Sequence, residues 1–153
     1  MSDESELDDQ AKELLERWAK EKVMSKITMV RQFTVDRTTW GVETMRNANG
    51  LMCCLGHHAR ACGATDDLID YMGMPEYVVI NAQNNEWEVD EEYFRVSSFA
   101  LLKIIHINDS NAPPAEKEVH LVKLFAKIGI VISFTGEFGP GNPHTNLKRL
   151  STD

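Results

Sequence analysis

One stretch near the C-terminus constrains the fold of this chain more than any other. Apolar residues recur at helical spacing over Pro114–Lys127, and Glu116 and Glu118 lie in the first turns, where carboxylates suit the positive end of the helix dipole. Gly129 interrupts this pattern, and apolar residues then alternate with others along Ile130–Phe134. The stretch therefore predicts a helix followed by a strand, and a fold that contains both.

The rest of the chain reads mostly as helix. We expect further helices beginning near Ser5 or Asp8, after Thr38–Thr39, over Leu51–Cys62, after Thr65 and after Ser97. The β-branched run after Tyr77, a turn at Asn84–Asn85 and the alternation up to Val89 predict a β-hairpin. The fold class expected is α+β, a mostly helical single domain with a small antiparallel sheet.

The size and composition of the chain suit one globular domain. It has 153 residues, of which 42% are hydrophobic and 26% charged. We expect the domain to cover residues 1–135 and a loose tail, rich in Gly and Pro, to cover 136–153. The N-terminal helix has an apolar stripe that we interpret as a packing face: Leu7, Ala11, Leu14, Leu15, Trp18, Ala19 and Val23.

The charge and the cysteines limit the class of protein. The net charge of −8 argues against general nucleic-acid binding, which needs clustered Lys and Arg. No apolar run approaches the roughly 20 residues of a membrane span, and the acidic start of the chain does not resemble a secretory signal. Three closely spaced cysteines, an odd number, fit a reducing compartment. We therefore expect a cytoplasmic protein with no membrane partner.

The densest group of reactive residues is Cys53–Cys62. On a helix, Cys54, His58 and Cys62 share one face and could bind zinc with His106 or His120. Structural zinc usually takes ligand pairs from separate turns, and free cysteines are often buried. We interpret the segment as packing and predict no metal and no cofactor. A cysteine nucleophile beside His57 is chemically permitted, but the sequence offers no residue to orient it.

Binding residues are easier to nominate than catalytic ones, because no phosphate-binding glycine loop, nucleophile elbow or paired-carboxylate motif is present. Tryptophans offer stacking faces, and arginines offer forked donors to phosphate. The polar run Asn108-Asp109-Ser110-Asn111 follows an apolar stretch and could coordinate a cation or receive ribose hydroxyls, although a helix stop is the more common use of such residues. The predicted ligand-binding residues are Trp40, Arg46, His57, His58, Arg60, Trp87, Arg95, Asn108 and Asp109.

Three features resemble a family of small bacteriophage proteins: Cys53-Cys54-Leu55-Gly56 after a Trp-containing segment, the step Met74-Pro75, and Asn108-Asp109 before a final helix. The family has no settled biochemical activity, so the resemblance implies a phage origin and an accessory role. This chain departs from it at His57 and His58, where the family generally has apolar residues. The N-terminal helix looks like an addition and could serve to make a homo-oligomer.

These observations lead to one main functional prediction and two alternatives. The main prediction is a non-enzymatic phage accessory protein that counters host defence by sequestering a small nucleotide-like signalling molecule in the host cytoplasm. The first alternative is an acidic protein that inhibits a host defence enzyme through protein–protein contact. The second is a thiol-dependent enzyme that uses Cys53, Cys54 or Cys62.

Overall fold

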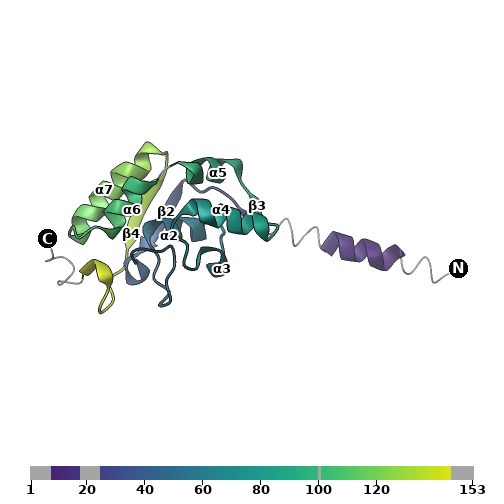
Figure 1. The fold of residues 1–153 in the computed structure, drawn as a ribbon, viewed down its shortest axis with the longest axis horizontal. Helices are drawn as coiled ribbons and strands as arrows, with labels where there is room; N and C mark the ends of the chain where they lie inside the picture. The colour runs from purple at the N-terminus through teal and green to yellow at the C-terminus, as the bar shows by residue number, and fades with distance from the viewer. Residues whose placement is uncertain (1–7, 18–24, 100, 146–153) are drawn as a thin grey trace.

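The computed structural model describes residues 8–17, 25–99 and 101–145 (Figure 1). The elements after the N-terminal helix are β1 (Lys26–Ile27), β2 (Gln32–Asp36), the 3-10 helix η1 (Arg37–Thr39), α2 (Cys54–Ala61), α3 (Asp66–Ile69), α4 (Pro75–Asn84), β3 (Glu88–Val89), α5 (Glu91–Ser98), α6 (Leu102–Asp109), α7 (Pro114–Lys127), β4 (Val131–Thr135) and the 3-10 helix η2 (Pro143–Thr145). The predicted mixture of helices and strands is confirmed. Within the described part of the chain, no helix combines the length and apolar character needed to cross a bilayer.

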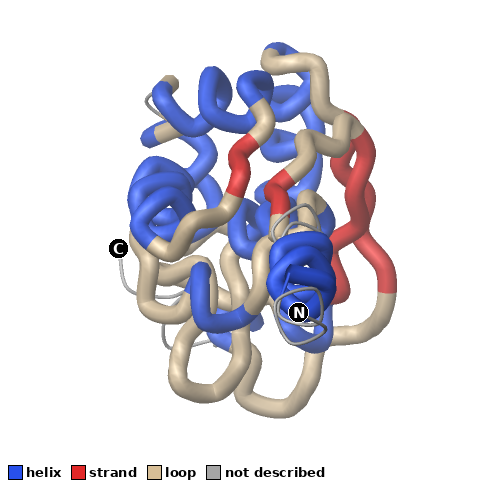
Figure 2. Tube along the Cα trace, turned by 90° about the vertical axis from the view of Figure 1, so that its right-hand side faces the viewer, coloured by secondary structure: helices blue, strands red, loops and turns tan. Residues whose placement is uncertain are grey.

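The strands form two separate pairs, and both pairs are parallel, so the predicted antiparallel sheet is wrong. β1 pairs with β3, and β2 pairs with β4. Figure 2 shows the longer pair along one side of the molecule. Parallel strands need a long crossover, and here α2 to α7 lie between β2 and β4 in the chain. Whether the strands run parallel or antiparallel therefore depends on which distant segments pair. The alternation of apolar residues within one strand does not contain that information.

The predicted hairpin over Tyr77–Val89 is also wrong, because its first half is the helix α4. Pro75 stands in the first turn of α4, where its fixed φ suits a helix and its missing N–H is not needed. Val78 and Val79 are buried in the core, so packing overrides their preference for strands. Only Glu88–Val89 is extended.

Helices α2, α3 and α7 confirm the helices predicted over Leu51–Cys62, after Thr65 and over Pro114–Lys127. The helix expected after Thr38–Thr39 is absent: only η1 forms there, and Trp40 then bridges to Met52 in an extended loop. The helix expected from Ser97 or Ser98 forms only from Leu102, as α6. Helix α5, which ends at Ser98, was not predicted.

Both ends of the predicted domain differ from expectation. Residues 136–145 pack on the domain instead of forming a loose tail: His144 is completely buried, and Asn142 Nδ2 donates to the carbonyls of Trp40 and Arg37 at 3.1 and 3.2 Å. Residues 8–17 are helical, and all ten are exposed, including Leu14 and Leu15, so their apolar face does not pack on the described domain of the same chain. Residues 18–24 and 146–153, including Trp18, Ala19 and Val23, lie outside the described residues.

The core brings α7 against β4 and α2 against β2. The rings of Phe33 and Phe125 meet edge to face at 5.3 Å. On its other side, α2 approaches the loop before it so closely that a Cβ added to Gly56 would lie 2.0 Å from the carbonyl oxygen of Met45. Glycine is therefore required at this position for space.

The contact between α2 and Met45 yields a stability prediction. We expect Gly56→Ala to destabilise the protein by about 3 kcal/mol or more, because backbone must move to relieve the clash. Gly73→Ala is the matched control, since nothing lies within 4 Å of its added Cβ. Urea unfolding of both variants measures the difference, and equal midpoints would contradict the close contact.

Candidate functional site

The side-chain amide of Asn108, in the last turn of α6, is the centre of a buried hydrogen-bond network. Its Oδ1 accepts from Trp40 Nε1 at 2.7 Å and from the Cys54 backbone N–H at 3.0 Å, and its Nδ2 donates to the Gly41 carbonyl at 3.0 Å. Trp40 and Asn108 are almost fully buried, so these bonds replace the water that the core excludes. Trp40 and Asn108 were both predicted to bind a ligand, and the structure does bring them together. Their polar groups are hydrogen-bonded to each other, so they are not available to a ligand.

Asp109 extends this network to the surface. Its Oδ1 accepts from the backbone N–H of Glu43 at 2.9 Å and from Asn108 Nδ2 at 2.9 Å. Glu43 has a φ of +73°, in a region that non-glycine residues seldom adopt, so the carboxylate fixes an unfavourable turn. Helix α6 ends at Asp109, in keeping with the helix stop considered for this pair.

Lys117 and His144 join the network from α7 and η2, and both are completely buried. Lys117 Nζ donates to the Asn108 carbonyl at 3.1 Å and lies 2.9 Å from His144 Nδ1. The Gly41 carbonyl only accepts, so His144 Nε2, 2.8 Å away, donates to it, and Nδ1 of the neutral ring accepts from Lys117. The His144 ring also stacks on Trp40, with centroids 3.8 Å apart. We call Trp40, Asn108, Lys117 and His144 the Asn108 network.

The sequence reasoning missed Lys117 and His144. A usable signal existed for Lys117: it is spaced by four residues from Leu121, and Leu121 by four from Phe125, so all three share the buried face of α7. His144 gave no signal, because its burial depends on how a Gly- and Pro-rich segment folds back onto Trp40.

The histidines and cysteines of α2 are buried and electrically neutral. Burial raises the pKa of the Cys53 thiol to about 12 and that of Cys62 to about 11. His58 Nε2 lies 3.5 Å from Cys62 Sγ, but it also lies 2.9 Å from the Val30 carbonyl, which only accepts, so Nε2 carries the proton. His58 thus presents no lone pair there to activate the thiol, and the thiols stay protonated at neutral pH.

Arg46 and Arg60 are held by acidic residues of α3 and its C-terminal end. Arg46 Nη1 pairs with Asp70 at 2.6 Å, and Arg46 Nε approaches Asp66 at 3.6 Å. Arg60 also pairs with Asp66. Both guanidinium groups already have carboxylate partners, so these two predicted residues are poorly placed to bind a phosphate.

The remaining two predicted residues differ in their surroundings. Trp87 is half-buried and packs against the core. Arg95, on α5, is exposed and has no hydrogen-bond or ion-pair partner within the described ranges. Among the predicted binding residues, Arg95 is the one that lines a cavity open to solvent.

This α5 cavity has a volume of about 470 Å³ and lies between α5, the C-terminal end of α7 and the start of β2. It is lined by Arg31, Glu92, Arg95, Val96, Phe99, Lys127 and Ile128. Arg31 pairs with Glu92 at 2.7 Å, whereas Lys127, like Arg95, has no partner in the described part of the chain. Phe99 is 55% exposed, and it and Arg95 also line an adjoining cavity that reaches Phe94.

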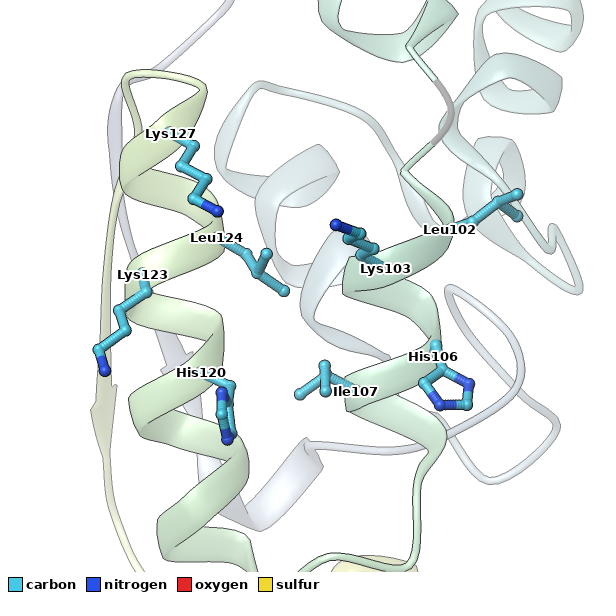
Figure 3. Close-up of a pocket in the computed structure, with 8 residues that line it drawn as sticks. All are labelled: Leu102, Lys103, His106, Ile107, His120, Lys123, Leu124 and Lys127. Carbon is cyan, nitrogen blue, oxygen red and sulfur yellow. The ribbon is translucent and has the colours of Figure 1, made fainter.

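A second hollow, the α6–α7 groove, has a volume of about 510 Å³. Figure 3 shows Leu124 and Lys127 of α7 and Ile107 of α6 directed into the space between the two helices. Its apolar residues are Leu102, Ile107 and Leu124, and its basic residues are Lys103, His106, His120, Lys123 and Lys127. No carboxylate lines the groove, so it is an apolar surface with a basic rim on an acidic protein.

Metal-binding geometry is absent from residues 8–17, 25–99 and 101–145, where no three His, Cys, Asp or Glu side chains gather as a site. In particular, His58 is engaged with Val30 and Cys62. The sulfur and imidazole groups of Cys53, Cys54, His57, His58 and Cys62 are buried in the domain.

The Asn108 network predicts a large effect of removing one amide. We expect Asn108→Leu to destabilise the protein by about 3 kcal/mol or more, because it leaves Trp40 Nε1, the Cys54 N–H and the Gly41 carbonyl buried with fewer partners. Asn84→Ala, at the exposed end of α4, is the control and should change little. Denaturant unfolding measures both, and a neutral Asn108→Leu would contradict the assigned role.

The buried His57 predicts a pH dependence of stability. Burial lowers its pKa from 6.5 to about 4, against a smaller opposing effect of a backbone hydrogen bond with Thr39. The unfolded chain takes up this proton first as pH falls below 6.5, so about 3 kcal/mol of stability is lost by the time pH reaches about 4.

Unfolding free energies measured between these pH values test this expectation. His57→Gln should flatten the decline, and Gln83→Ala, at an exposed residue that does not titrate, should keep the wild-type decline. An unchanged decline in His57→Gln would show that other groups cause it, such as His58, whose pKa burial also lowers.

Comparison with known proteins identified no relative of this chain. Protein-family models, curated proteins and solved structures gave no match to this chain. The candidate sites therefore rest on the geometry and charge of the described residues.

Proposed function

We propose that this protein is a non-enzymatic binding protein that captures a small nucleotide-like anion in the α5 cavity. The observation that carries the proposal is Arg95, an exposed guanidinium without a partner in the described ranges, beside an exposed aromatic ring in that cavity. A volume of about 470 Å³ suits a ligand of nucleotide size.

The charges of the cavity favour a phosphate. Arg31, Arg95 and Lys127 contribute three cations, against one carboxylate from Glu92. Arg31 is already paired with that carboxylate, so Arg95 and Lys127 supply the uncompensated charge. The planar fork of an arginine can bind two oxygens of one phosphate, and lysine adds a point charge.

The aromatic residues supply the second half of the recognition. Phe99 borders both the α5 cavity and its neighbour, and Phe94 borders the neighbour. A base stacked on an exposed ring gains about 1–3 kcal/mol. A ligand with a phosphate on Arg95 and a ring on Phe99 would use both properties of the site.

The lining favours binding over chemical conversion. It holds no cysteine, histidine or hydroxyl nucleophile, and its carboxylate is engaged by Arg31. General acid–base or nucleophilic catalysis needs such a group within reach of the ligand. We propose that the protein is a phage accessory protein that counters host defence by sequestering a signalling nucleotide in the host cytoplasm. This role needs tight binding and no catalytic group.

Titration calorimetry and thermal unfolding test the proposal with AMP, ADP-ribose, a cyclic dinucleotide and inorganic phosphate. A probe at a hundred times its Kd should stabilise the protein by about 2.7 kcal/mol. We expect Arg95→Ala and Phe99→Ala each to weaken binding about tenfold or more, and Arg95→Lys to retain part of the affinity.

Two exposed residues elsewhere provide matched controls. Arg60→Ala and Tyr77→Ala should leave the affinity unchanged, because neither side chain lines the α5 cavity. The proposal fails if none of the nucleotides binds, or if a nucleotide binds equally well to Arg95→Ala and Phe99→Ala.

A further inference from the structure

The structure also contains a groove and a helix that complement each other. We propose that helix 8–17 of a second copy of this chain docks in the α6–α7 groove, and that two copies exchange these helices to form a homodimer. This interaction is separate from nucleotide capture and uses a neighbouring surface, which shares Lys127 with the α5 cavity.

The groove offers an apolar floor that the described fold leaves uncovered. Leu102 is 61% exposed, and Ile107 and Leu124 are only half-buried. Figure 3 shows Ile107 and Leu124 directed toward each other from the two helices. Apolar surface of this kind, surrounded by polar side chains, is typical of a protein–protein contact.

The helix offers matching apolar residues. Leu14 and Leu15 are 62% and 64% exposed, and Ala11, one turn earlier, is exposed as well. An amphipathic helix whose apolar side is open to water gains little stability from propensity alone, so packing against another surface is expected to stabilise it. An apolar groove between two helices is a recurrent receptor for such a helix.

Charge selects this helix as the occupant. The rim residues Lys103, His106, His120, Lys123 and Lys127 have no hydrogen-bond or ion-pair partner among the residues that the structure describes. Helix 8–17 carries four carboxylates, Asp8, Asp9, Glu13 and Glu16, against two cations. Opposite charges around an apolar contact favour this pairing and fix its orientation.

Length and position agree with an exchange between copies. A ten-residue helix is about 15 Å long, and the groove side of α7, from His120 to Lys127, extends over about 10 Å. Figure 1 shows helix 8–17 beyond β3, at the end of the molecule opposite α6 and α7. A second copy can supply the helix, and a two-fold arrangement fills both grooves in the same way.

Sedimentation of the full chain over a range of concentrations tests the proposal. We expect a monomer–dimer equilibrium that weakens as salt is raised, because the rim contacts are solvent-exposed. Leu14→Ser should weaken dimerisation about tenfold. Glu13→Lys with Glu16→Lys, and separately Lys103→Glu with Lys123→Glu, should each weaken it by a similar factor.

Combining the two charge reversals provides the decisive comparison, because it restores opposite charges across the groove and should restore dimerisation. The double variant Glu76→Lys with Glu86→Lys, on exposed positions in and after α4, controls for the change in net charge and should dimerise normally. Lys127 is left intact because it also lines the α5 cavity.

Two results would overturn the proposal. A wild-type chain that stays monomeric at the highest concentration excludes exchange between copies and points to docking within one chain or to another partner. A dimer that is unaffected by all the groove and helix variants places the interface elsewhere. Nucleotide titration of the same variants shows whether the α5 cavity works independently.

Discussion

The amide of Asn108 is the interaction on which the arrangement of this molecule depends. A single side chain satisfies the Trp40 indole, the first turn of α2 through Cys54, and the Gly41 carbonyl. These groups come from segments far apart in the chain, and each would be costly to bury unpaired. The amide therefore couples α6, α2 and the loop after β2, while Lys117 and His144 tie α7 and the C-terminal segment to the same point.

Most residues with reactive side chains are used in this way to build the fold. Cys54, His57 and His58 in α2 and Cys53 just before it are buried, and Arg46 and Arg60 are neutralised by carboxylates. Burial keeps thiols and imidazoles in their neutral forms, because the low-dielectric interior disfavours charge. The helix that looks richest in chemistry is consequently a packing element, and the chemistry available to a ligand lies elsewhere.

Arg95 and three lysines gather on one part of the protein. Arg95 and Lys127 border the α5 cavity, and Lys103, Lys123 and Lys127 border the α6–α7 groove. A chain with a net charge of −8 thus presents a local positive surface. Such segregation suits the selective attraction of an anion or an acidic helix without general affinity for nucleic-acid backbones.

Local patterns of residues were enough to predict several elements: α7 with β4 after it, α2, α3, and the helix stop at Asp109. Arg95 was also among the binding candidates, as one of several arginines whose forked donors suit a phosphate. The tertiary structure decided the direction of the sheets, the helical state of Pro75–Asn84, and which polar residues are buried. Local periodicity reports how one segment can bury its own apolar face. Strand pairing, the enclosure of Lys117 and His144, and the joining of α5 and α7 around a cavity depend instead on segments that meet only when the chain folds.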